Sequence, residues 1–242
     1  MIQKMKANIV RLSLAMITTA LVLSGCLKSS DNITQPPART YISLMHLAPT
    51  APSLDIFFND TKASSAAFTP GTVTAGYNAV DKGTYTVTFK KATSDSVVAS
   101  IPPAQYDSLN YYTLLIYNQS ENGPASAARI KDDFSNLTND KGYYRFFHTS
   151  PNTGAVDLYI DNIKVQSSRM LADNTGYDAL NKFSAASSGS HGVQAKVAGT
   201  DSVIATLTQV DLLAGNAYTF YLKGLTGGTG NNELSIGSLR AN

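Results

Sequence analysis

Two histidine–aspartate pairs are the residues of this 242-residue chain whose types and spacing could do chemistry. His46 lies nine residues before Asp55, and His148 lies nine residues before Asp157. An imidazole oriented by a carboxylate can act as a general base, so either pair could serve a hydrolase. The chain has no serine in a GxSxG-like setting, however, and its one cysteine is Cys26. A histidine before a proline-containing turn more often hydrogen-bonds loop carbonyls, and we expect that role here and no catalytic residue.

Oxygen-bearing side chains gather around the same aspartates. They are Asp55, Asn59 and Asp60 in one place, and Asp157, Asp161 and Asn162 in the other. Clustered oxygens suit calcium, but the chain has no DxDxDG loop. Asn and Asp directly after a strand usually form a hairpin turn. We therefore expect turns at both places, and neither a metal nor a cofactor.

Aromatic side chains offer a further candidate site, because sugars stack on aromatic faces. The chain has 13 Tyr and 9 Phe but no Trp, and most of these aromatics fall at core positions of predicted strands. Phe57 and Tyr159 occupy equivalent outward positions and are our candidate surface aromatics. The Gly-rich segment from Leu225 lacks the lysine of a phosphate loop and reads as a flexible connection.

The N-terminus has the pattern of a bacterial lipoprotein signal. Three cations and no acid precede the apolar run from Leu12 to Leu23. At about 1.5 Å per residue this run spans roughly 18 Å, too short for a ~30 Å hydrocarbon core. The run ends in LSGC, which resembles the bacterial lipobox. We therefore expect residues 1–25 to be removed and Cys26 to carry a lipid that anchors the chain to a membrane.

The predicted processing changes the charge and leaves a tether. Removing three cations turns the net charge of +2 into +2 − 3 = −1, which does not indicate a basic face for nucleic acid. Because Cys26 is the only cysteine, no disulfide can form within the chain. Residues 26–39 are polar with two prolines and read as a lipid-anchored linker. The expected location is the cell envelope, and the outer membrane in particular, with its surface and periplasmic faces both open.

The rest of the chain contains one unit twice. The segment YISLMHLAPTAPSLDIFFN from Tyr41 matches YYRFFHTSPNTGAVDLYID from Tyr143 at an offset of 102. A second match, TSDSVVA with GTDSVIA, has an offset of 106, because a loop is longer in the second copy. These matches predict two homologous domains, residues 40–135 and residues 142–242.

Short β-rich runs alternate with turn residues in both copies, and no helical apolar period follows the signal. We expect strands at Tyr41–Leu47, Leu54–Phe58, Thr84–Lys90, Val97–Ile101, Tyr111–Tyr117 and Ala125–Ile130, and at Tyr143–Thr149, Ala155–Ile160, Val193–Val197, Val203–Leu207, Ala217–Lys223 and Glu233–Leu239. The alternation places His46 and His148 on core faces and Asp55 and Asp157 on outward faces. The fold class is therefore all-β, with two tandem immunoglobulin-like antiparallel β-sandwiches.

One tyrosine in the later part of each copy is assigned to the fold. Tyr112 and Tyr218 each begin a strand and follow an aligned asparagine. The second setting resembles the tyrosine corner of Greek-key sandwiches, in which the hydroxyl bonds a backbone group a few residues upstream. We therefore expect both hydroxyls to bond backbone rather than a ligand.

These motifs together resemble the DUF4397 domain, an immunoglobulin-like sandwich of secreted and lipid-anchored bacterial proteins. The resemblance rests on MHLAPTAPSLDIFF and FHTSPNTGAVDLYI, on DKGTYTVTF, and on AGNAYTFYLKG. It covers about residues 39–119 and 142–224, although the second copy has SGSHGVQAKV in place of the GxYxV element. The resemblance implies a fold and no substrate.

Three functions stay open. The favoured one is a lipid-anchored binding or scaffolding protein without catalytic activity, whose partner is a glycan or an envelope protein. The second is a purely structural spacer, and the least favoured is a hydrolase using His46 or His148. A concave patch holding Phe57 or Tyr159 would favour binding over spacing.

Overall fold

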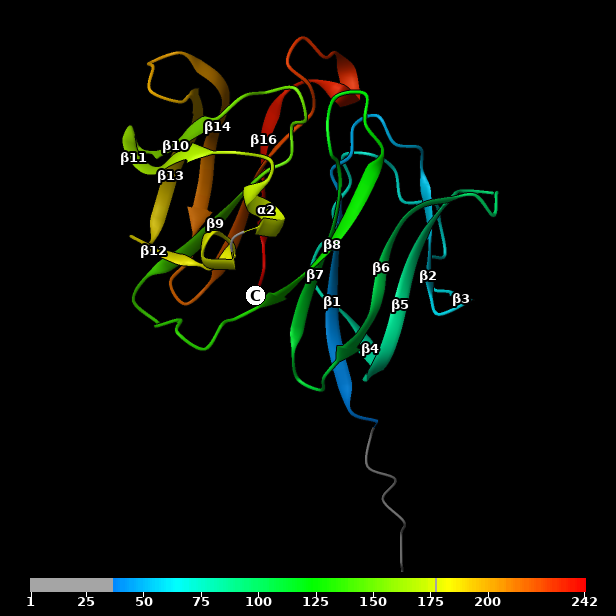
Figure 1. The fold of residues 1–242 in the computed structure, drawn as a ribbon. Coiled ribbons are helices and arrows are strands. Elements are labelled where there is room, and N and C mark those ends of the chain that lie inside the picture. The colour runs from blue at the N-terminus through cyan, green and yellow to red at the C-terminus, as the bar shows by residue number, and fades with distance from the viewer. Residues whose placement is uncertain (1–36, 177) are drawn as a thin grey trace, which may run out of the picture. The chain divides into compact units, whose positions relative to one another are not determined.

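The computed structural model describes residues 37–176 and 178–242. This part of the chain contains sixteen strands in four four-stranded sheets. Residues 38–242 belong to one compact unit (Figure 1). None of the helices in the described residues is long and apolar enough to cross a membrane.

The first copy is a sandwich of two sheets. The sheet order β4-β1-β7-β8 joins Asn78–Asp81, Arg39–His46, Tyr111–Asn118 and Ala125–Asp132. The order β3-β2-β5-β6 joins Thr61–Lys62, Leu54–Phe58, Gly83–Lys91 and Val97–Tyr106. The chain thus passes several times from one sheet to the other, as in Greek-key sandwiches.

The second copy repeats this topology strand for strand. One sheet has the order β12-β9-β15-β16, from Ser184–Ala186, Gly142–His148, Ala217–Lys223 and Ser235–Arg240. The other has the order β11-β10-β13-β14, from Ile163–Arg169, Val156–Ile160, Gly189–Val197 and Val203–Leu212. His46 and His148 both end the first strand of their copy, and Asp55 and Asp157 both stand second in the next strand. The repeat alignment is therefore confirmed.

All the predicted strands are present, and the all-β prediction is confirmed, but three features differ. Strands β3, β4, β11 and β12 were missed, because these edge strands are short or polar. The short helix α2 (Asp173–Gly176) and the 3₁₀ turns η1 (Asp178–Asn181) and η2 (Gly230–Asn232) were also missed. The sheets are not purely antiparallel, since β1 pairs with β7, and β9 with β15, in parallel. A parallel pair needs a long crossover, and the other sheet supplies it in each copy.

Each copy has its own core between its two sheets. In the first copy the core includes Ile42, Ile56 and Ile116, and in the second it includes Phe146 and Leu158. Ile42, Ile56, Phe146 and Leu158 lie on the faces that the alternation assigned to the core. The period of two therefore predicted the inward faces correctly.

The opposite faces of β1 and β9 are buried as well, because the two copies pack against each other. A third cluster joins Met45, Leu47, Leu115, Tyr117 and Ile130 of the first copy to Phe147 and Tyr221 of the second. Both faces of β9 are buried along its whole length. A strand buried on both faces reads as a nearly continuous apolar run, and this explains the sequence YYRFF.

The predicted tyrosine corners are confirmed. The Tyr218 hydroxyl accepts a hydrogen bond from the Leu213 N–H at 3.1 Å, and the Tyr112 hydroxyl accepts one from the Asp107 N–H at 3.4 Å. Both side chains are buried. Each hydroxyl satisfies a backbone donor where the chain crosses between sheets.

Candidate functional site

The residues of the predicted signal and lipid site, 1–25 and Cys26, lie outside the described residues, and so does most of the linker. The structure does place the histidines, the aspartates, the candidate aromatics and the turn residues.

Both strand-end histidines bond loop carbonyls, as predicted. His46 Nε2 lies 3.0 Å from the Pro52 carbonyl oxygen, and His148 Nε2 lies 2.9 Å from that of Gly154. A carbonyl only accepts, so Nε2–H is the donor in each ring. Burial lowers the pKa of both imidazoles below the ordinary value, which keeps them neutral. Neither ring bonds the aspartate that follows it, so the histidine–aspartate pairs expected for a general base do not form.

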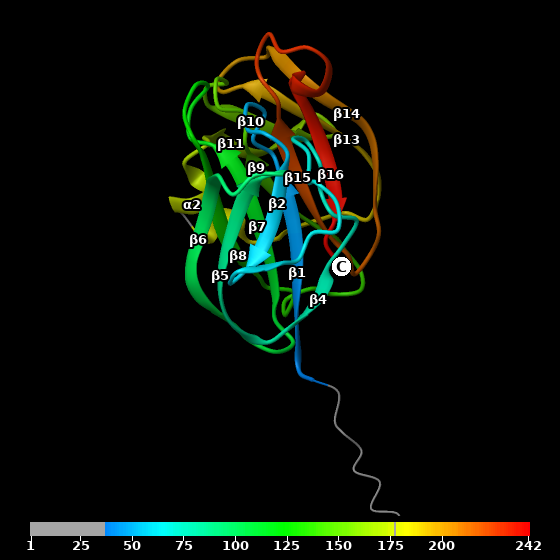
Figure 2. The same ribbon diagram turned by 90° about the vertical axis from the view of Figure 1, so that its right-hand side faces the viewer.

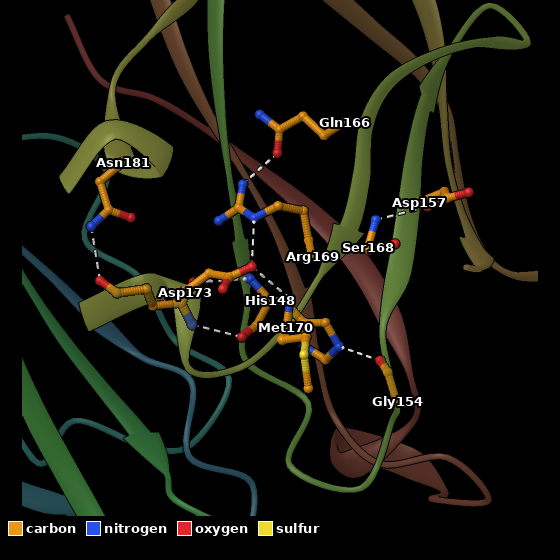
Figure 3. Close-up of polar contacts among 10 residues, drawn as sticks. His148, Gly154, Asp157, Gln166, Ser168, Arg169, Met170, Asp173 and Asn181 are labelled. Carbon is orange, nitrogen blue, oxygen red and sulfur yellow. Dashed lines mark hydrogen bonds and ion pairs between the residues drawn. The ribbon is translucent and has the colours of Figure 1, made fainter. Parts of the chain in front are cut away.

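The aspartates were expected on the outward faces of their strands, and the structure places them there but buries them. They leave the core face, but a lysine and loop backbone cover them, so that Asp55 is 7% exposed and Asp157 is 1% exposed. Asp157 accepts hydrogen bonds from the Ser168 N–H at 2.8 Å (Figure 3) and from Lys164 Nζ at 2.9 Å. The Ser168 N–H is the main cause of the lowered pKa of Asp157. Each carboxylate thus ties down a neighbouring hairpin.

The residues after β10 form a hairpin turn. Asp161 and Asn162 both have positive φ, at 49° and 64°, which is the signature of a type I′ hairpin turn. Asp161 also accepts hydrogen bonds from the Gly192 N–H at 2.9 Å and from His191 Nδ1 at 2.6 Å. No group of three or more His, Cys, Asp or Glu suited to a metal occurs within the described residues.

The candidate aromatics lie on outer sheet faces, where lysines partly cover them. Lys90 Nζ lies 4.6 Å from the centre of the Phe57 ring, and Lys196 Nζ lies 4.3 Å from that of Tyr159. Both side chains are half-buried and lie at equivalent positions of β2 and β10. The structure has a groove between the two copies, described below, and another in the first copy lined by residues of β1, β2 and β4. Neither Phe57 nor Tyr159 lines either groove.

The second copy contains a polar network that sequence reasoning missed (Figure 3). The buried Arg169 guanidinium donates to Gln166 and, at 3.2 Å, to Asp173. Asn174 of α2 brackets the backbone of His148, because its Oδ1 accepts from the His148 N–H at 3.2 Å and its Nδ2 donates to the His148 carbonyl at 2.6 Å. These contacts fasten the α2 segment to the end of β9.

A groove of about 740 Å³ runs between the segment that contains α2 and η1 and the first copy. One wall is the end of β8 with the loop after it, including Lys131, Asp133 and Phe134. The facing wall comes from α2 and η1, including Asp178 and Lys182. Residues from both copies therefore build one concavity, which neither copy forms alone.

The groove is lined by groups of both charges. Arg129, Lys131 and Lys182 are cationic, whereas Asp132, Asp133 and Asp178 are anionic. The lining also includes the aromatic rings of Tyr111 and Phe134 and the amide side chains of Asn110, Asn174 and Asn181. Such a surface offers donors, acceptors and apolar contact to one ligand.

A buried ion pair joins the copies, and one of its members, Asp132, also lines the groove. Arg145 of β9 donates to Asp132 of β8, and both side chains are at most 1% exposed. Arg145 also donates to Thr113 and Thr219, each at 2.9 Å. The hydroxyl of Tyr77 donates to Asp132 at 2.5 Å. Every polar atom of this cluster is thereby engaged, as a buried charge pair requires.

The sequence profile of one family matches almost all of the region after the linker. It is described as "Domain of unknown function (DUF4397)", and it matches residues 40–159 and 145–236. The chain belongs to this family. No match to a curated protein was found. The two DUF4397 matches overlap at residues 145–159, inside the segment Tyr143–Asp161 that repeats Tyr41–Asn59.

The DUF4397 copies differ in the places that build the groove. Asp132 lies in a segment that the repeat alignment does not cover, and Arg145 is aligned with a residue of another type. No repeated motif therefore marked either of them. One signal was present, namely an arginine in the otherwise apolar run YYRFF. A lone charge in a run expected to be buried on both faces predicts a buried partner of opposite charge.

Proposed function

We propose that this chain is a lipid-anchored binding protein of the bacterial cell envelope, and that its ligand occupies the groove between the two DUF4397 copies. The observation that carries the binding proposal is the groove itself, since both copies contribute its walls and its lining mixes charges, amides and aromatic rings. The LSGC sequence that ends at Cys26 supports the anchor. The partner is a glycan or an envelope protein rather than nucleic acid.

The anchor is tested by labelling cells with a fatty acid. The parent chain is expected to take up the label and to sediment with membranes, because a cysteine carrying two or three acyl chains gives stable anchoring. Cys26→Ser should lose both the label and the sedimentation. Equal labelling of the two chains would reject the anchor.

The groove is tested with arrays of bacterial surface glycans and envelope peptides. Asp178→Ala and Lys182→Ala alter exposed groups of one wall and should weaken any genuine binding. Lys82→Ala is the matched control, because Lys82 is exposed and lies outside the groove. Binding that both groove variants and the control leave unchanged would place the ligand elsewhere.

A spacer is the second candidate, and one observation favours it. The two copies are joined by an apolar cluster and a buried ion pair, which suits a rigid strut. If the chain is a spacer, no ligand should bind in the arrays. Cells should then lose the function of the chain only when the interface between its two copies is broken. Retention of function after both groove substitutions would therefore favour the spacer.

A further inference from the structure

We propose that β14 is an interface strand, through which two copies of this chain pair edge to edge. This inference goes beyond ligand binding in the groove and does not depend on it. It rests on a comparison of β14 with β6, its counterpart in the first copy. Each is ten residues long, and each is the last strand of its sheet. Figure 2 shows β14 (orange) along the margin of its layer.

An edge strand exposes a row of backbone N–H and C=O groups that can pair with another chain, and proteins commonly block such edges. The two strands can be compared residue by residue, because Ile101 faces Val87 in β5 as Leu207 faces Val193 in β13. Position 101 therefore matches position 207, an offset of 106. Both strands share an irregularity in register just after this position, so the bulge does not distinguish them.

The edge of β6 is blocked in the first copy. Pro102 and Pro103 remove two backbone donors, which is the usual way proline is tolerated at an edge or a bulge. The guanidinium of Arg129 donates to the Gln105 carbonyl at 3.1 Å and so covers an acceptor. Asp107 adds a charge directly after the strand.

None of these blocks is present at the matching positions of the second copy. Thr208 and Gln209 replace the prolines and keep their N–H groups. Ser238 stands where Arg129 stands, because both face equivalent residues of β7 and β15, and Leu213 stands where Asp107 stands. Within residues 37–176 and 178–242, the backbone of β14 has hydrogen bonds only to β13.

The composition of β14 suits a second copy of itself. Its sequence VIATLTQVDL has one charged residue, Asp211, near its end. Two such strands that run antiparallel about an axis between Leu207 and Thr208 place Asp211 opposite Ile204. No like charges then meet, and Val203 and Leu213, which are 46% and 48% exposed, are covered at the two ends. A pairing of this kind is isologous and closes as a dimer.

The test is the molar mass of the full chain in a mild detergent, measured by light scattering over a wide range of concentration. The parent is expected to reach the mass of a dimer. A variant with Thr208→Pro and Gln209→Pro copies the block of β6 and should weaken dimerisation by at least about tenfold. Its melting temperature, compared at a concentration at which the parent is monomeric, should stay near that of the parent, since β6 accommodates both prolines at the same bulge.

Two further variants separate backbone pairing from other effects. Ser238→Arg restores the arginine of the first copy and should also weaken the dimer. Thr206→Ala changes an exposed side chain of β14 but keeps its N–H, so it should leave the dimer intact. A parent that stays monomeric at every concentration, or that pairs only with an added extended peptide, would overturn the proposal. A double-proline variant that folds and dimerises like the parent would overturn it as well.

Discussion

The two copies satisfy the same pair of backbone groups in different ways. In the first copy the His46 N–H donates to the Thr72 carbonyl at 2.9 Å, and the His46 carbonyl accepts from the Gly71 N–H at 2.7 Å. In the second copy the side chain of Asn174 replaces both partners of His148. The first copy thus folds a plain loop against its strand end, whereas the second attaches α2 there.

This difference shows how one fold came to present two surfaces. The core strands, the strand-end histidines and the tyrosine corners are the same in both copies. The segment after β11 differs, and in the second copy it becomes a wall of the groove. A side-chain clamp can be removed by one substitution, whereas a backbone clamp cannot. The two copies therefore allow matched tests.

The largest effect is expected where the copies meet. Asp132→Ala should lower the free energy of unfolding by about 3–5 kcal/mol, because it leaves the buried Arg145 charge without its partner. Urea denaturation measures the change. Asp81→Ala is the control, since its ion pair with Arg39 is exposed and should contribute less than about 1 kcal/mol. Similar losses from the two variants would contradict the buried ion pair as the principal link.

The next effect concerns the clamp of the second copy. Asn174→Ala should destabilise the chain by about 2–6 kcal/mol, since each of two stranded backbone groups costs about 1–3 kcal/mol. Hydrogen exchange should become faster in α2 and at the end of β9, but not around His46, whose partners are backbone groups. Unchanged exchange around His148 would show that the α2 segment is held by other contacts.

The tyrosine corners give a smaller effect that should differ between the copies. Tyr218→Phe removes a 3.1 Å bond to the Leu213 N–H and should cost about 1–3 kcal/mol. Tyr112→Phe removes a longer bond of 3.4 Å and should cost less. Denaturant midpoints of the two variants settle the order. A midpoint unchanged in Tyr218→Phe would mean that its hydroxyl is not a structural acceptor.

The smallest effect is the pH dependence from His46 and His148. Both have a folded-state pKa below the ordinary 6.5, so the unfolded chain binds more protons as the pH falls through 6.5. Stability is therefore complete well above pH 6.5 and declines as the pH falls through it, with a loss of a few tenths of a kcal/mol per histidine at pH 6.5. Urea midpoints at several pH values measure the decline. His46→Gln and His148→Gln should each flatten it, and a profile identical to that of the parent would contradict the assignment.

The sequence predicted the fold because the fold depends on local patterns. Alternation located the core strands and their inward faces, and the repeat fixed the equivalence of His46 with His148. The tyrosine corner followed from Asn216 and Tyr218 as neighbours. The loop role of the histidines followed from the proline turns after them.

The groove could not be predicted in the same way, because it depends on how two copies meet. The alternation left Met45 and Phe147 on outward faces, and only their mutual packing buries them. Alternation placed Asp55 and Asp157 on outward faces but could not predict their burial, because it reports the side of a sheet and not what covers it. Asn174 lies in a segment without periodicity, where nothing in the sequence identifies its backbone partners.

The central claim is that the two DUF4397 copies form one unit, on which the groove depends. Residue-resolved hydrogen exchange of the full chain in increasing urea tests this claim most directly. The central strands β1 and β7 of the first copy and β9 and β15 of the second should open together, with the same free energy and the same urea dependence. The account is contradicted if one copy opens in a separate transition while the other stays protected.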